Sequence, residues 1–311
     1  MTILVTGTAG FIGSTLVDQL LAKGLDVVGA DNFDPYYAKE LKLRNIASAR
    51  KNKRFTFATA DIRDGVAMKK LLKDVEAVFH LAAKAGVRNS LADPLGYHDV
   101  NVTGTLNLLE LCRNSSVRKI IYASSSSVYG PTTRLPIGED HPTAPLSPYG
   151  ASKLAGEAYV HTYDRIHGLR GISLRFFTVY GPRQRPDEAI CKFTTQLTHG
   201  EPITIYGTGA QTRDFTYVDD IVTGLIASWR SKSHGEAFNL GSGRRVALTD
   251  VINTLGTALG TRITKKAGPP AAGDVPDTWA DITRAREAFG YEPKTAIEDG
   301  IPRFVSWWKQ L

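Results

Sequence analysis

The sequence predicts an α/β fold in which a doubly wound parallel sheet is followed by a smaller C-terminal α/β lobe. Short apolar runs rich in β-branched residues recur at residues 3–7, 26–31, 55–61, 77–83, 119–125 and 172–177. Segments with helical periodicity lie between them, for example at residues 11–23, 95–113 and 149–167. Nearly continuous apolar strands that alternate with helices are typical of a parallel sheet covered by helices on both faces.

The pattern changes after about residue 178, where loops rich in Gly, Pro and Arg surround short strands expected at 202–207 and 237–241. We therefore expect residues 1–177 to form the sheet domain, with residues 215–245 returning to it. Residues 178–214 and 246–311 would form the smaller, substrate-binding lobe. A chain of 311 residues, of which 42% are hydrophobic, is long enough to bury the cores of two such lobes.

The charge and the cysteine content argue against nucleic-acid-binding and metal-binding proteins. The net charge of +7 suits anionic small molecules or simply a solvated surface. The densest basic stretch, residues 49–54, has no interleaved aromatic residues, which argues against nucleic-acid binding. No stretch reaches membrane-spanning length and no signal peptide is evident, so we expect a cytoplasmic protein without membrane contact. Cys112 and Cys191 match no metal or redox spacing, and we expect buried thiols and no metal site.

A glycine-rich turn follows the first expected strand. Gly7, Gly10 and Gly13 have the spacing G-x-x-G-x-x-G and open a helix. Glycine allows a tight turn and close approach to phosphate, and the helix N-terminus offers amide donors to a pyrophosphate. Asp31 ends the second strand, where an acid binds the adenosine ribose hydroxyls and repels a 2′-phosphate. Together these features predict a Rossmann-type site for NAD. Asp61 ends the third strand, either near the adenine or as a helix N-cap.

A tyrosine and a lysine lie four residues apart just after Pro148. A helix beginning there would place Tyr149 and Lys153 on one face, although this spacing alone is also typical of a surface pair. A neighbouring ammonium and a nicotinamide cation would lower the phenol pKa from its usual value of about 10. The phenolate could then take a proton from a sugar hydroxyl while hydride leaves the same carbon for NAD. The four serines at 124–127 could hold the substrate oxygen, or form a plain loop.

A set of motifs runs nearly end to end: GTAGFIG, HLAAKAGV, NVTGTLNLLE, SSSSVYG, SPYGASK, RFFTVYGP, RDFTYVDD and GDVPDTWAD. In these motifs the chain resembles the extended short-chain dehydrogenase/reductases of the NAD-dependent epimerase/dehydratase family, and among them most resembles UDP-glucuronate 4-epimerases. The resemblance implies NAD-dependent C4 epimerisation of UDP-glucuronate to UDP-galacturonate through a 4-keto intermediate. A UDP-glucose/UDP-galactose or UDP-N-acetylhexosamine 4-epimerase is the alternative. A catalytically silent NAD-binding sensor is a more remote one.

The resemblance also implies roles for individual residues. Tyr149 would be the base, Lys153 would lower its pKa and hold the nicotinamide ribose, and Ser125 would be the catalytic hydroxyl. With the glycine turn, the expected cofactor-binding residues are Gly7, Gly10, Phe11, Ile12, Gly13, Asp31, Asn32, Asp61, Ile62, Leu81, Ala82, Ala83, Lys84, Asn101, Tyr149 and Lys153. The expected UDP-sugar contacts are Arg88, Ser126, Ser127, Thr178, Arg185, Tyr206, Arg213 and Asp274.

Comparison within the family narrows the reaction. Sugar-nucleotide 4,6-dehydratases carry an Asp-Glu pair where this chain has Ser126 and Ser127, and UDP-glucuronate decarboxylases carry a glutamate at the second position. Epimerisation is therefore expected. Thr178 stands where UDP-galactose 4-epimerases usually have Asn, and with Ser127 it would donate hydrogen bonds to a sugar carboxylate. Ala271 replaces a side chain that binds the diphosphate in relatives, so this contact would depend more on Arg213.

Arginines and helices outside these motifs leave two further questions open. Arg88, Arg183 and Arg185 are candidate anion-binding residues, with ordinary loop arginines as the alternative. In relatives the helices expected at 95–113 and 149–167 pair into a four-helix dimer interface, so a homodimer is expected. The apolar residues of these helices that would serve either that interface or the core are Leu106, Leu109, Leu154, Ala158 and Val160.

Overall fold

A seven-stranded parallel sheet forms the centre of the computed structural model, which describes residues 1–311 except 133, 207–208, 210 and 269–276. The strand order is β11-β6-β5-β4-β1-β2-β3. The strands are β1 (Thr2–Thr6), β2 (Asp26–Asp31), β3 (Phe55–Thr59), β4 (Val75–His80), β5 (Lys119–Ser125), β6 (Arg170–Phe176) and β11 (Glu236–Leu240). The predicted doubly wound sheet is confirmed. Its strand order reverses between β1 and β4, and in such sheets ligands bind beyond the carboxyl ends of the strands at this point.

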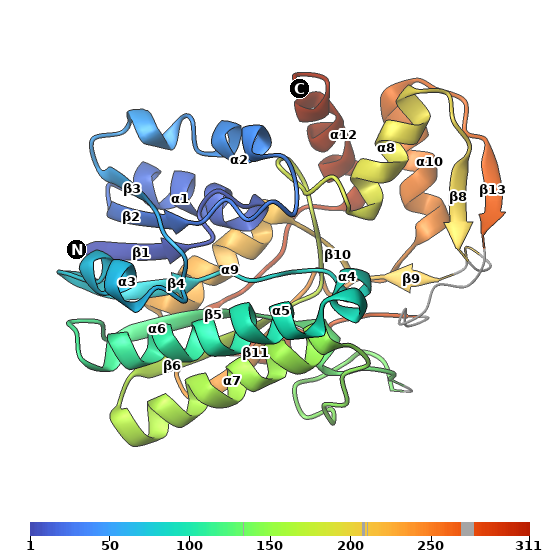
Figure 1. Ribbon diagram of the computed structural model, residues 1–311. Helices are drawn as coiled ribbons and strands as arrows, with labels where there is room; N and C mark the ends of the chain where they lie inside the picture. The colour runs from blue at the N-terminus through green and yellow to red at the C-terminus, as the bar shows by residue number, and fades with distance from the viewer. Residues whose placement is uncertain (133, 207–208, 210, 269–276) are drawn as a thin grey trace.

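Helices cover both faces of this sheet (Figure 1). One apolar cluster contains Leu16 of α1 (Phe11–Ala22) and Leu225 of α9 (Val218–Arg230). The other cluster contains Leu108 of α6 (Gly104–Arg113) and Val160 of α7 (Pro148–His167), with α3 (Gly65–Leu71) beside them. Neighbouring residues of β5 enter opposite clusters, because successive side chains of a strand point to opposite faces. This double coverage explains why the strand sequences are nearly continuous apolar runs.

The helix expected at 95–113 is divided in the structure. It consists of α5 (Pro94–His98), a π-helical turn at Asp99–Thr103, and α6. A π-helical turn widens the helix by one residue and often occurs at functional sites. Here it contains the buried Asn101, whose side chain hydrogen-bonds the backbone of a neighbouring segment.

A third apolar cluster lies in the C-terminal part of the chain. It joins α8 (Ala189–Thr198), α10 (Leu248–Leu259) and α12 (Ile297–Trp308), and β8 (Ile203–Tyr206) pairs beside it with β13 (Lys265–Gly268). Figure 1 shows these elements gathered at the upper right, away from the sheet. The remaining short elements are α2 (Lys39–Asn45), α4 (Val87–Ala92), β7 (Thr178–Tyr180), β9 (Thr212–Arg213), β10 (Phe215–Tyr217), β12 (Val246–Ala247) and α11 (Thr283–Phe289).

The expected return of residues 215–245 to the sheet domain has support in the pairing of β11. This strand lies beside β6 and extends the sheet by one parallel strand. We keep as a proposal the division into a sheet domain, 1–177 with 215–245, and a lobe of 178–214 and 246–311. In the part of the chain that the structure describes, no helix has the length and apolar character needed to span a membrane. Both cysteines are buried, as expected.

Candidate active site

The turn between β1 and α1 requires glycine at two positions. Gly7 has a φ of +72°, and a Cβ on it would lie 2.8 Å from the backbone nitrogen of Ala82. A Cβ on Gly13 would lie 2.1 Å from the carbonyl oxygen of Gly7. The turn therefore packs directly against the end of β4 and against the first turn of α1. This close packing leaves the N-terminus of α1 open to the neighbouring pocket, as binding of a pyrophosphate requires.

Replacing Gly13 by alanine is expected to weaken NAD binding by at least about tenfold. The new methyl group would overlap the Gly7 carbonyl, so the turn would have to open and its amide donors would move. Fluorescence titration with NAD measures the effect, and circular dichroism checks that the fold is retained. Ser14→Ala is the matched control, because it alters the next residue without adding a Cβ. Equal NAD affinity in Gly13→Ala and the unmodified protein would contradict the assigned role of the turn.

The carboxylate of Asp31 lines the same pocket and is held by backbone nitrogens. Its two oxygens accept hydrogen bonds from the backbone nitrogens of Ala9, at 3.0 Å, and Phe33, at 2.8 Å. Burial raises the pKa of Asp31, while the two backbone hydrogen bonds and the charge of Lys42 act in the opposite direction. The side chain is therefore oriented by the backbone before any ligand arrives, which suits an acceptor for ribose hydroxyls.

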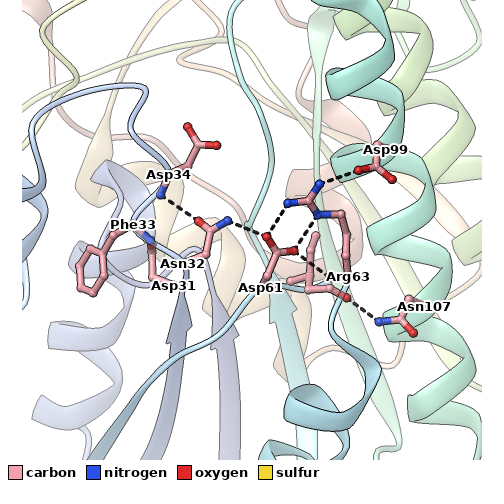
Figure 2. Close-up of polar contacts among 9 residues, drawn as sticks. Asp31, Asn32, Phe33, Asp34, Asp61, Arg63, Asp99 and Asn107 are labelled. Carbon is pink, nitrogen blue, oxygen red and sulfur yellow. Dashed lines mark hydrogen bonds and ion pairs between the residues drawn. The ribbon is translucent and has the colours of Figure 1, made fainter.

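Asp61 does not cap a helix, so that alternative is wrong. The cap of α3 is Asp64, which accepts hydrogen bonds from the first backbone nitrogens of the helix. Figure 2 shows Asp61 held between Asn32, whose amide lies 2.9 Å away, and Arg63, whose guanidinium lies 2.7 Å away. Hydrogen bonds from Arg63 hold the pKa of Asp61 well below its usual range. Arg63 also pairs with Asp99 at 2.5 Å, which ties this edge of the pocket to the π-helical turn.

The first pocket collects nearly all the residues expected to bind the cofactor. Those that line it are Gly7, Gly10, Phe11, Ile12, Gly13, Asp31, Asn32, Asp61, Ile62, Leu81, Ala82, Ala83, Lys84, Tyr149 and Lys153. Asn101 is not among the lining residues. Its side chain instead contacts the backbone of a lining residue. It accepts a hydrogen bond from the backbone nitrogen of Lys84 at 2.8 Å and donates one to the carbonyl oxygen of Lys84 at 2.9 Å. We therefore assign it the positioning of this segment.

Several lining residues were not identified from the sequence. Asp34, Tyr36 and Tyr37 come from the segment between β2 and α2, and Lys42 comes from α2 itself. All four line the pocket beside Asp31. The ammonium group of Lys42 donates a hydrogen bond to the carbonyl of Asp34 at 2.6 Å and lies 4.7 Å from the centre of the Tyr37 ring. The DNFDPYY stretch at residues 31–37 resembles a motif of relatives and could have indicated that this segment lines the site. It does not extend to Lys42.

Tyr149 and Lys153 occupy the first turns of α7, as predicted. Ser147 caps this helix by accepting a hydrogen bond from the nitrogen of Gly150, and Pro148 occupies the first helical position. Lys153 is buried, and its ammonium group donates a hydrogen bond to the carbonyl of Ala123 at 2.8 Å. The helix start thus brings both side chains to the carboxyl end of β5.

Burial has the largest effect on the pKa values of Tyr149 and Lys153. Burial raises the pKa of Tyr149, and a hydrogen bond from Ser125 and the charge of Arg185 oppose that rise. Burial also lowers the pKa of Lys153 to about 7. In the described structure, Ser125 and Arg185 thus act to lower the pKa of the phenol. The predicted effect of Lys153 on the phenol stays a prediction.

A second pocket adjoins the first. Of the residues expected to bind substrate, it is lined by Ser126, Ser127, Thr178, Arg185 and Arg213, together with Ser125 and Tyr149. Tyr149 and Arg185 line both pockets. A reacting group placed beside Tyr149 would therefore face the cofactor pocket on one side and the substrate pocket on the other. This arrangement suits hydride exchange between two bound molecules.

Glu188 is a substrate-pocket residue that sequence reasoning missed. Its carboxylate lies 2.7 Å from the guanidinium of Arg185, which also pairs with Asp187 at 2.9 Å. Burial raises the pKa of Glu188. The charge of Arg185 is therefore partly compensated within the pocket. Nothing in the sequence distinguished Glu188 from an ordinary helix-start acid.

Four of the remaining candidates lie elsewhere or outside the described residues. The guanidinium of Arg88 lies 5.0 Å from the centre of the Tyr206 ring, and neither residue lines one of the two pockets. Arg183 pairs with Asp18 at 2.7 Å, which favours its structural interpretation. Asp274 lies outside the described residues, as does Ala271. Among the described residues, no group of His, Cys, Asp and Glu is arranged to hold a metal ion.

Comparison with known proteins identifies the family. The model of the NAD-dependent epimerase/dehydratase family matches residues 3–241. The chain belongs to this family.

Individual relatives match over their full length. A UDP-glucuronate 4-epimerase of Thermodesulfobacterium geofontis is 41% identical, over 99% of this chain and 96% of the relative. The Bacillus cereus UDP-glucuronic acid 4-epimerase, solved in complex with UDP-glucuronic acid and NAD, is 41% identical with a TM-score of 0.96, over 100% of this chain and 99% of that chain. The Thermotoga maritima UDP-glucose 4-epimerase, solved with UDP-glucose, is 34% identical with a TM-score of 0.93, over 100% and 99%.

Membership of the NAD-dependent epimerase/dehydratase family confirms the predicted cofactor. The residues that line the first pocket fit NAD. The glycine turn lies beside the N-terminus of α1, where a Cβ on Gly13 would close the turn. Asp31 lines the same pocket and is held by the backbone nitrogens of Ala9, within that turn, and Phe33. The protein is therefore an NAD-dependent enzyme of this family.

Proposed function

We propose that the protein is a UDP-glucuronate 4-epimerase, which interconverts UDP-glucuronate and UDP-galacturonate through a 4-keto sugar. The observation that carries this proposal is the position of Tyr149, which lines both the cofactor pocket and the substrate pocket. Full-length similarity to two UDP-glucuronate 4-epimerases supports the choice of substrate.

Tyr149 is the proposed base. Its phenolate takes the proton of the sugar 4-hydroxyl, and the Ser125 hydroxyl, which is hydrogen-bonded to Tyr149, lies where it can also contact the substrate oxygen. Bound NAD supplies the acceptor for the C4 hydride and later returns it. Tyr149 keeps the proton until the keto sugar presents its other face, and then returns it to O4. Hydride and proton both return to the sugar, so the reaction consumes no oxidant.

Hydroxyl donors line the part of the substrate pocket that we assign to the C6 carboxylate. Ser127 and Thr178 both line this pocket, and the hydroxyl oxygens of Ser125 and Ser127 lie 3.1 Å apart. Hydrogen bonds to a charged acceptor are stronger than those to a neutral one. A 4-keto uronate is a β-keto acid, so donors that hold its carboxylate would also restrain loss of carbon dioxide.

Thr178→Asn is expected to lower kcat/KM for UDP-glucuronate by about tenfold or more, because one hydrogen bond to a charged group contributes about 1.5–3 kcal/mol. The rate with UDP-glucose, which lacks the carboxylate, should change much less. Thr178→Ser is the matched control, since it keeps the hydroxyl and should retain uronate turnover. Equal losses with both sugars would contradict a carboxylate contact at this residue.

The substrate itself is tested by incubating the purified protein, without added NAD, with UDP-glucuronate and separately with UDP-glucose. NMR follows the C4 epimers. Conversion of the uronate alone supports the proposal and shows that NAD is retained. Conversion of the neutral sugar alone would favour the alternative, a UDP-glucose 4-epimerase with the same base. No conversion of either sugar after NAD is supplied would point to another sugar nucleotide or to a silent NAD-binding protein.

We further propose a cytoplasmic homodimer formed through α5, α6 and α7, which lie side by side in Figure 1. Leu109 and Val160 are fully buried and so belong to the core of the single chain. Leu95, Tyr159 and Ile166 on these helices are exposed and could form the interface. Light scattering coupled to size-exclusion chromatography tests the dimer, and a monomeric mass at all concentrations would contradict it.

A further inference from the structure

Glu157 is a buried carboxylate on α7, one helical turn after Lys153. Its side chain is only 3% exposed. It lines neither of the two pockets and therefore has no assigned place in binding or catalysis. Residues four apart lie on one face of a helix, so Tyr149, Lys153 and Glu157 follow one another along the side of α7 that faces β5. A buried carboxylate at this position needs an explanation, because burying a charge is costly.

Hydrogen bonds from Arg175 and Ser124 fix the Glu157 carboxylate. The Nε of Arg175 on β6 donates to one of its oxygens at 2.9 Å, and a terminal nitrogen of the same guanidinium donates to the other at 2.8 Å. The hydroxyl of Ser124 on β5 donates to it at 2.5 Å. Arg175 is held in turn by the phenol oxygen of Tyr129 at 3.0 Å. The carboxylate is thus fixed relative to both strands whose carboxyl ends border the reaction site.

The charge of Glu157 acts on Lys153. Burial lowers the pKa of Lys153 to about 7, and the Glu157 carboxylate opposes that effect. An opposite charge nearby favours the charged form of a group, and its influence is strong where water is excluded. Without this anion, the lysine would lose its proton at a lower pH.

We propose that Glu157 is a positioning residue for the reaction. Its carboxylate, fixed by Arg175 and Ser124, keeps the amine of Lys153 charged where the lysine borders the cofactor pocket. The inference rests on the proposed function, because it assumes that the enzyme needs Lys153 as an ammonium. Glu157 touches neither pocket and acts through the lysine.

None of the titratable groups His80, Tyr122 and Tyr149 near Lys153 is an anion at neutral pH. Glu157 is therefore the negative charge that acts on the lysine. His80 on β4 is buried, which lowers its pKa to about 3 and keeps it neutral at pH 7, with the charge of Lys153 adding to that effect. Tyr122 on β5 lies with its ring centre 5.0 Å from the ammonium, and burial keeps its pKa well above the usual value. The pKa of Tyr149 on α7 is raised as well. Both phenols are therefore uncharged at neutral pH before a nicotinamide cation is bound.

The test measures the protonation of Lys153 directly. The enzyme saturated with NAD carries lysine labelled with carbon-13 at Cε, and its NMR shift is followed against pH. Lys153→Arg assigns the resonance by removing it. In Glu157→Gln we expect the pKa of Lys153 to fall by about one pH unit or more. The alkaline limb of kcat against pH should move by the same amount, with the KM for UDP-glucuronate within about twofold of its original value.

Variants of the same pair separate charge from structure. Glu157→Gln leaves Arg175 buried without its counter-ion, so the double variant Glu157→Gln/Arg175→Gln is measured beside it and should also lower the pKa of Lys153. Arg175→Gln alone disturbs the same contact but keeps the anion, and should not lower that pKa. Glu157→Asp keeps the charge and should restore most of the original value.

The NMR titration of Lys153 tests the role of Glu157 without requiring turnover of a particular substrate. An unchanged Lys153 pKa in both variants that lack the Glu157 charge would overturn it. Equal falls in Arg175→Gln and Glu157→Gln would also overturn it, because they would reveal a structural role only. If UDP-glucuronate is not converted even by the unmodified enzyme, the proposed function fails. The NMR titration would still show whether Glu157 sets the charge of Lys153.

Discussion

Replacing Tyr149 by phenylalanine is expected to reduce epimerisation by at least about 10³-fold, which corresponds to about 4 kcal/mol of transition-state stabilisation. The substitution removes only the phenol oxygen, which is the proposed proton acceptor. The ring should keep its place, because it packs edge-on against Tyr97 with ring centres 6.3 Å apart. Both pockets should therefore still form, and affinity for NAD and the UDP-sugar should stay within a few-fold.

NMR detection of the C4 epimer measures turnover in this variant, and calorimetry measures binding. Tyr163→Phe is a suitable control because Tyr163 lies on the same helix and hydrogen-bonds Glu110. It removes a phenol oxygen from α7 away from the two pockets and should keep full turnover. If Tyr149→Phe epimerises at the original rate, another residue is the base. If it also fails to bind NAD, the loss of turnover would say nothing about proton transfer.

Features set by neighbouring residues could be predicted from the sequence. The glycine turn, the acid at the end of β2 and the start of α7 each depend on a few consecutive side chains and on backbone geometry. Gly13 is an example: the requirement for glycine follows from a turn that the motif itself describes. The parallel, doubly wound sheet was also predicted, because nearly continuous apolar strands that alternate with helices are typical of that architecture.

Features set by contacts between distant segments could not be predicted. Lys42, on α2, lines the cofactor pocket. Asn101, in a π-helical turn that interrupts the expected helix, does not line it. The pKa values of Tyr149 and Lys153 depend on burial and on partners from other elements. A four-residue spacing reveals none of these influences. The same limit applies to Arg88, which lies beside Tyr206 and outside both pockets.

Replacing Lys153 by methionine is expected to lower turnover by about 10²-fold or more while increasing the stability of the fold. Methionine has a similar length but carries no charge, so it cannot stabilise a phenolate or hold a ribose hydroxyl. Lys119→Met is the matched control, since Lys119 on β5 is also a buried lysine, with its pKa lowered to about 8 by burial. It hydrogen-bonds Ser228 and Ser231 rather than the site, and its loss should leave turnover intact.

The expected gain in stability follows from the pKa of Lys153. The unfolded lysine holds its proton up to about pH 10.5, whereas the folded one, lowered by burial, holds it only up to about 7. Between these values the unfolded state binds more protons, so stability rises with pH in that window. At pH 7 the buried lysine therefore costs on the order of 4 kcal/mol. Chemical denaturation of the unmodified protein and of Lys153→Met from pH 7 to 10 measures the difference, which should favour the variant and shrink as pH rises. A gap that grows with pH, or a variant less stable at pH 7, would show that Lys153 is charged at little cost in the folded protein.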